Sequence, residues 1–200
     1  MDDPFYIETD AINNGPGVLG SLRVRVLMRE PARTHQIGEY IRYLPSAYHT
    51  FCPFKQDGRW FALFSGDYTI TEVMELPTCK RIAAEKSSSH GFCPVDFYVP
   101  FDDPRVMASG QAGHFGFVAG CIWGDDSSWK IQHLDLSQIA SGRIVRSERF
   151  GYIEMPNEMT RLSDCISFQE YSPPNSSAIT VRIAAPAYLD MVTGLPYGPV

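Results

Sequence analysis

The sequence predicts an α+β protein that is mostly β: a largely antiparallel sheet or sandwich of about nine strands with one or two short helices. Two observations support this fold class. Short apolar segments follow one another along the chain, and glycines and prolines (16 and 15) fall between them, as turns between strands require. The predicted strands and helices do not alternate strictly, which argues against a doubly wound parallel fold. Residues 1–200, of which 44% are hydrophobic, are expected to form a single domain.

The first fifty residues predict two strands and then a helix. Residues 5–7 indicate a short strand, and at 20–29 apolar residues alternate with arginines, which is typical of a strand with one buried face. At 34–44 apolar residues recur at positions i, i+3, i+4 and i+7, which predicts a helix with one apolar stripe. Pro45 would end this helix, because the residue before a proline avoids the helical region.

The middle of the chain predicts three strands, a second short helix and an exposed loop. Asp57-Gly58 is a strong signal for a two-residue hairpin turn. The predicted elements are strands at 59–65, 68–76 and 95–101, a short helix within 77–85 and a loop at 102–113.

The clearest pair of strands is predicted at 115–123 and 129–136, joined by a loop of residues 124–128. The first strand is apolar or glycine throughout, which indicates a central position with both faces covered. If the loop holds an odd number of residues, Trp123 and Trp129 face each other across the pair. Further strands are predicted at 143–154, 165–171 and 178–184.

Charge and cysteine content narrow the classes of function. The net charge of −6, with few and scattered basic residues, argues against direct nucleic-acid binding. No apolar stretch approaches the roughly 20 residues that span a bilayer. The five cysteines are an odd number and widely spread, and the acidic first residues do not resemble a secretory signal. We therefore expect a cytoplasmic protein with reduced thiols and no membrane contact.

The phrase His-x-Phe-Cys-Pro occurs twice, at 49–53 and 90–94. An imidazole and a thiolate three positions apart can reach one metal ion, so two such pairs could form a tetrahedral zinc site. The four candidate ligands are His49, Cys52, His90 and Cys93. Common zinc sites begin with cysteine, however, whereas histidine comes first in both pairs. The alternative is two buried cysteines with no cofactor, each beside a histidine that is hydrogen-bonded locally.

Enzymatic chemistry has weaker support in the sequence. A metal-dependent hydrolase could use the two His-Cys pairs, or Asp125 and Asp126 together with His133 and Asp135. A Cys-His nucleophile is a further hypothesis, although no signature surrounds any of the cysteines. The sequence contains no phosphate-binding loop, no Gly-x-Ser-x-Gly and no His-Glu-x-x-His. Enzymatic activity therefore stays open and is the less favoured reading.

A binding surface is predicted at the turn between the two clearest strands. Trp123 and Trp129 flank Asp125 and Asp126, and tryptophan is enriched where interfaces bury most of their energy. The alternative is that both tryptophans pack on the sheet and that the acids are solvated in a turn.

Two segments, HGFCPVDFYVP at 90–100 and FGFVAGCIWGDDSSWKIQHLDLS at 115–137, resemble small bacterial proteins carried by phages and integrated mobile elements. The resemblance implies no fold and no catalytic residue, but proteins of this kind often bind and block a host protein complex. The sequence thus favours a non-enzymatic protein-binding module. We expect an inhibitor of a host defence or nucleic-acid-handling complex, with a basic nucleic-acid-binding protein as its partner. A metal-dependent hydrolase and a zinc-stapled structural domain are the alternatives.

Overall fold

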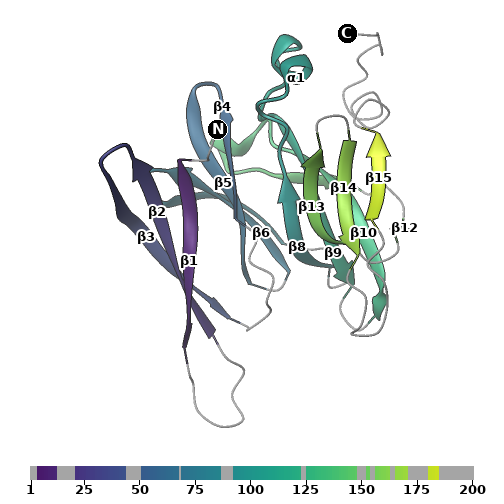
Figure 1. The fold of residues 1–200 in the computed structure, drawn as a ribbon, viewed down its shortest axis with the longest axis horizontal. Coiled ribbons are helices and arrows are strands. Elements are labelled where there is room, and N and C mark those ends of the chain that lie inside the picture. Colours follow the sequence, from purple (N-terminus) through teal and green to yellow (C-terminus); the bar gives the residue numbers. More distant parts are fainter. Residues whose placement is uncertain are drawn as a thin grey trace.

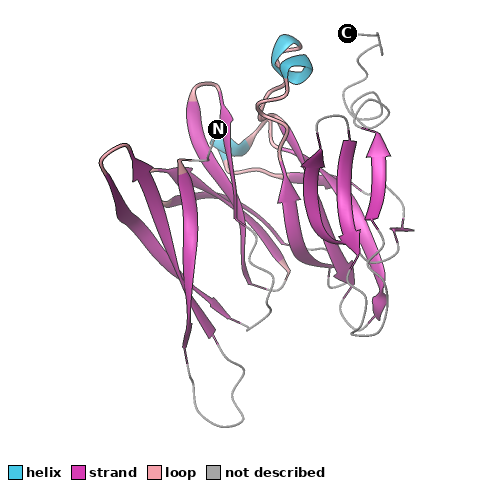
Figure 2. Cartoon of the chain, in the orientation of Figure 1, coloured by secondary structure: helices cyan, strands magenta, loops and turns pink. Residues whose placement is uncertain are grey.

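The structure is a computed structural model that describes ten segments of the chain: residues 4–12, 21–43, 51–67, 69–86, 92–122, 125–147, 152–153, 156–162, 165–170 and 180–184. Within these segments almost all regular structure is β, which confirms the predicted fold class (Figure 2). The strands are β1 (Phe5–Ile12), β2 (Ser21–Glu30), β3 (Arg33–Tyr43), β4 (Phe51–Gln56), β5 (Arg59–Asp67), β6 (Ile70–Leu76), β7 (Lys80–Lys86), β8 (Phe92–Tyr98), β9 (Phe115–Ile122), β10 (Asp125–Asp135), β11 (Val145–Ser147), β12 (Tyr152–Ile153), β13 (Pro156–Leu162), β14 (Cys165–Glu170) and β15 (Thr180–Ala184). The helical elements are α1 (Pro104–Ala108) and the 3-10 turn η1 (Ile139–Ser141).

The strands form four antiparallel sheets, each built from strands that follow one another in the sequence (Figure 1). Sheet A has the order β1-β2-β3, and sheet B has the order β4-β5-β6-β7. Sheet C has the order β11-β10-β9-β8, with β12 also paired to β10, and sheet D has the order β13-β14-β15. Each sheet is therefore a meander, in which neighbouring strands are adjacent in sequence.

Sheet B is the middle layer of a stack, because both of its faces are covered. In β5, Phe61 and Leu63 belong to a core shared with Phe97 and Val118 of sheet C. The residues between and after them, Ala62 and Phe64, belong to a second core shared with Phe5 and Val26 of sheet A. Successive side chains of a strand point to opposite faces, so this one strand contributes to two cores. The predicted strand at 59–65 is thus confirmed as a buried strand.

The outer face of sheet A is polar. Arg25 of β2 lies 2.9 Å from Asp10 and 3.5 Å from Glu8, both on β1. Arg29 lies over the ring of Tyr6, 5.0 Å from its centroid. The alternation predicted for residues 20–29 is therefore confirmed, with an apolar face toward sheet B and an ion-paired face outward.

The turn between β4 and β5 anchors sheet B to the segment around α1. Asp57 and Gly58 both have positive φ (49° and 79°), as the predicted two-residue turn requires. Beside the turn, the buried amide of Gln56 donates to the carbonyl oxygens of Gly113 at 3.1 Å and Leu136 at 3.0 Å. The Gln56 side chain therefore holds the backbone just before the start of β9 and just after the end of β10.

The helix predicted at 34–44 is wrong, because residues 34–43 belong to strand β3. Val26 of β2 pairs with Gly38, and the next residue, Leu27, pairs with Gln36. Ile37 is therefore left without a partner on β2. This bulge shifts the alternation, so Ile37 and Tyr40, three positions apart, both pack on the core between sheets A and B. A bulged strand has therefore produced the spacing that indicated a helical stripe.

Other boundaries also differ from the prediction. Residues 77–79 form a turn after a cis Leu76-Pro77 bond, and β7 follows where a short helix was expected. The predicted loop at 102–113 contains α1, and the segments described here hold more strands than the nine expected, among them β13. The single domain expected for residues 1–200 stays a prediction.

Candidate functional site

The repeated phrase opens two consecutive sheets. Phe51, Cys52 and Pro53 begin β4 of sheet B, and the second Phe-Cys-Pro begins β8 of sheet C. Each of the two strands pairs with the next strand of its own sheet: Cys52 lies opposite Leu63, and Cys93 lies opposite Cys121. Each copy of the phrase therefore lies at the start of the first strand of its sheet.

The two cysteines of the phrase occupy different layers. Cys52 packs on the core between sheets B and C. Phe92 belongs to that same core, so Cys93, the next residue of β8, points to the opposite face of sheet C. The backbone of sheet C thus lies between the two side chains.

His49 and His90 lie outside the described residues, so the predicted four-ligand site is not tested. Within the described segments, no three His, Cys, Asp or Glu side chains are grouped as metal ligands. The placement of Cys52 and Cys93 on different layers favours two separate thiols over one shared ion.

The binding turn predicted between the two clearest strands contains the start of β10 and a break in its pairing with β9. The ladder between β9 and β10 pairs Asp125 with Ile122, and the next pair is Trp129 with Cys121. Residues 126–128 therefore have no partner on β9, and we call residues 125–128 the acidic bulge. Bulges re-aim the chain and are frequent beside functional sites.

The expected loop at 124–128 is corrected by this register, since β10 already begins at Asp125. Trp129 is opposite Cys121 on β9 and Ile153 on β12, and so does not face another tryptophan at either position. Trp123 lies outside the described residues.

His133 and Asp135 contact different neighbours. The His133 ring lies between two aromatic rings of β9, with centroids 6.2 Å from Phe115 and 5.9 Å from Phe117. The Asp135 carboxylate accepts hydrogen bonds from the backbone N–H and the hydroxyl of Ser137, at 2.9 and 2.6 Å. Each side chain thus contacts residues nearby in the fold, and the hydrolase site stays a prediction.

A polar cluster between sheets A and B was missed by the sequence analysis. Glu72 of β6 has a side chain only 10% exposed, and Arg81 of β7 donates to it at 2.9 Å. The Arg81 guanidinium also lies over the rings of Phe64 and Tyr40, 5.4 and 5.9 Å from their centroids. A Cβ at Gly66 would collide with the Glu72 carboxylate, so the glycine makes room for this acid.

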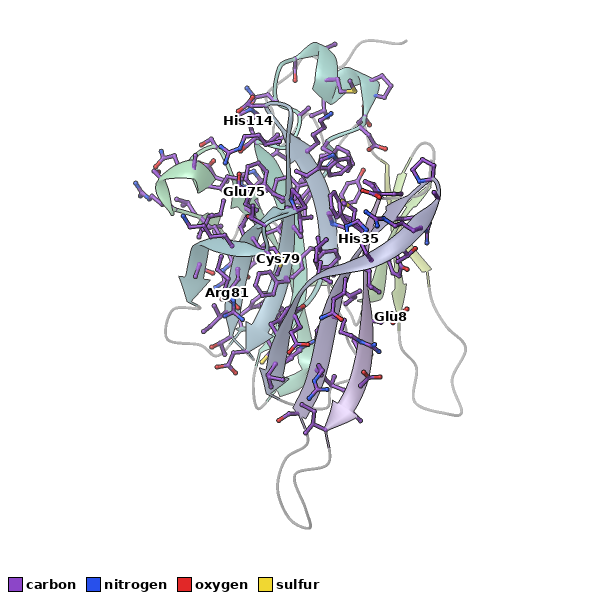
Figure 3. All side chains as sticks on the ribbon, turned by 90° about the vertical axis from the view of Figure 1, so that its left-hand side faces the viewer. Glu8, His35, Glu75, Cys79, Arg81 and His114 are labelled. Atoms are coloured by element: carbon purple, nitrogen blue, oxygen red, sulfur yellow. The ribbon has the colours of Figure 1, made fainter. Side chains whose placement is uncertain are left out.

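Burial dominates the electrostatics of this cluster. It raises the pKa of Glu72 above the ordinary value of 4.5, and the nearby Arg81 opposes the shift with a smaller effect. Burial raises the pKa of the Tyr40 phenol and of the Cys79 thiol in the same way. Cys79 lies in the turn that leads into β7, two residues before Arg81 (Figure 3). A protonated, unreactive thiol does not suit nucleophilic catalysis, so we interpret the cluster as structural.

Glu72 is expected to make the protein less stable as the pH rises. The folded chain holds this proton more tightly than the unfolded chain, so the contribution is full below pH 4.5 and is lost as the pH passes through the raised pKa. Urea unfolding of Glu72→Gln and the parent protein, between about pH 4 and 8, should show the variant gaining relative stability with pH. Arg81→Met, which removes the group that lowers this pKa, should extend the loss to higher pH. A pH-independent difference for Glu72→Gln would contradict the assignment.

No signal in the sequence pointed to this cluster. Glu72 stands in a predicted strand with apolar neighbours, where an acid on the solvent face is the usual interpretation. Only the packing of β3 across β5 and β7 shows that this face is covered.

Comparison with models of known protein families finds no match to this chain. Comparison with curated proteins finds no match either. In the described residues no helix has the length and apolar character needed to cross a membrane.

Proposed function

We propose that the protein is a non-enzymatic binding module for another protein, with the acidic bulge at the centre of the contact. The supporting observation is the break in the β9–β10 ladder, which leaves residues 126–128 without a partner on β9. Their backbone groups on that side are not used by the ladder, and the segment carries acidic and hydroxyl side chains in sequence. Such a segment suits recognition of a basic surface.

The proposed partner is a basic protein of a host defence or nucleic-acid-handling complex in the cytoplasm. The net charge of −6 supports attraction to such a partner and speeds the encounter. An inhibitor of this kind acts by occupying the surface that the partner uses for its own target.

The test compares two variants that lose the same charge. Asp125→Ala/Asp126→Ala alters the bulge, whereas Glu30→Ala/Glu39→Ala removes two acids from sheet A, which lies at the other end of the stack. Protein from host lysate that is retained by the parent chain would be identified, purified and titrated against all three proteins. We expect at least a tenfold weaker affinity for the bulge variant, about 1.4 kcal/mol or more, and little change for the control.

Two results would count against this proposal. Unchanged affinity of a folded bulge variant would exclude the bulge as the contact. Equal weakening of both variants would show that overall charge, and not this segment, attracts the partner.

A further inference from the structure

Cys93 and Cys121 are direct partners in the antiparallel ladder between β8 and β9. Directly opposite residues of such a ladder have Cα atoms about 4.5 or 5.5 Å apart, depending on the kind of pair. A disulfide needs Cα atoms about 4.4–6.8 Å apart, so either kind of pair meets this requirement. The register thus places the two cysteines at the same position along the neighbouring strands β8 and β9.

We infer that Cys93 and Cys121 are a redox-sensitive pair that forms a reversible disulfide across β8 and β9. Cys93 carries a reduced, buried thiol. Its counterpart in the first copy of the phrase, Cys52, lies opposite Leu63 and therefore cannot form a bond of this kind. The two copies of the phrase thus provide one competent cysteine and one matched control.

The oxidant is a small disulfide such as glutathione disulfide. The thiolate of one cysteine attacks one sulfur of the glutathione disulfide. This forms a mixed disulfide between the protein and one glutathione and releases the other glutathione as a thiolate. The second cysteine thiolate then attacks the protein sulfur of that mixed disulfide and releases the second glutathione. The two cysteines give up two electrons and two protons, and the glutathione disulfide becomes two glutathione thiols. Excess reduced glutathione reverses both steps.

The bond would lie at the base of the acidic bulge. Cys121 is opposite Cys93 on one side and opposite Trp129, the first residue paired after the bulge, on the other. Oxidation would therefore fix the strand from which the bulge departs. The inference itself rests on the β8–β9 register and does not depend on the proposed partner.

The experiment is mass spectrometry after oxidation in a glutathione redox buffer, alkylation of the remaining thiols and digestion with trypsin. Cleavage after Lys86, Arg105 and Lys130 places Cys93 and Cys121 on separate peptides. We expect these two peptides to be recovered joined, with a mass lower by two hydrogen atoms than their sum, while Cys52 stays alkylated. Excess reduced glutathione should return both peptides to the alkylated form.

Variants and a second route of oxidation keep the test decisive. Cys52→Ser should leave the linkage unchanged, whereas Cys121→Ala should abolish it and trap a glutathione adduct on Cys93. Because Cys93 is buried, the reduced chain is also refolded in the same buffer, where burial does not limit access. Linkage by either route supports the inference. Its absence by both routes, or linkage of Cys93 to Cys52 in place of Cys121, would overturn it.

Discussion

Replacement of Phe64 by alanine is expected to lower the free energy of unfolding by about 3–5 kcal/mol, the usual cost of emptying a fully buried phenylalanine site. The side chain is 0% exposed, and its ring lies 4.9 Å from that of Tyr40 on β3. The loss falls on the core between sheets A and B, because Phe64 faces sheet A. Urea unfolding of Phe64→Ala beside the parent protein measures it.

Phe61→Ala is the matched control for this prediction. Phe61 is 2% exposed and belongs to the same strand, but it packs on the core shared with sheet C. Hydrogen exchange should show the Phe64 variant opening mainly the amides of sheet A, and the Phe61 variant opening those of sheet C. The same pattern of exchange in both variants would contradict two separate cores.

Gly38→Ala is expected to destabilise the protein by about 1–3 kcal/mol, because the added methyl group overpacks the contact between sheets A and B. A Cβ at position 38 would lie 2.6 Å from the sulfur and 2.7 Å from the Cβ of Cys79. Cys79 leads into β7 with a φ of 53°, so its side chain cannot withdraw without a change in the turn.

Cys79→Gly should rescue the Gly38 variant. It removes both atoms of the collision, and glycine adopts a positive φ without steric cost. In a double-mutant cycle followed by urea unfolding, Gly38→Ala should cost little in the Cys79→Gly background. An unchanged cost in that background would mean that the collision with Cys79 is not the cause.

Local patterns predicted the parts of the fold that depend on local chemistry. The alternation at 20–29 identified β2, and Asp57-Gly58 identified the hairpin turn between β4 and β5. The apolar run at 115–123 identified the centrally placed β9. Each of these signals lies within about ten residues, which is the range over which periodicity and turn chemistry act.

Features that depend on pairing with distant strands could not be predicted. The bulge at Ile37 and the acidic bulge are set by the register with a neighbouring strand, and the sequence of one strand does not specify that register. The burial of Glu72 likewise depends on β3 lying over sheet B. The shape of the β9–β10 hairpin, in which the acidic bulge lies, therefore could not be read from the sequence.

The His-x-Phe-Cys-Pro phrase shows how a chemical pattern can have a structural origin. Phe51 packs toward sheet A while Cys52 packs toward sheet C. Phe92 in the second copy belongs to sheet C and packs toward sheet B. In both copies the phenylalanine therefore faces the sheet that comes before its own in the sequence. The phrase therefore marks equivalent positions in the first strands of sheets B and C.

The ion pairs on the outer face of sheet A affect how readily a second molecule could stack on this face. A stack of similar layers can in principle recruit the first layer of a neighbouring molecule, as strands do in a growing fibril. Covering Arg25, Glu8 and Asp10 would take their charges out of water at a cost that their mutual attraction does not recover. We therefore expect this face to disfavour the stacking of a second molecule on sheet A.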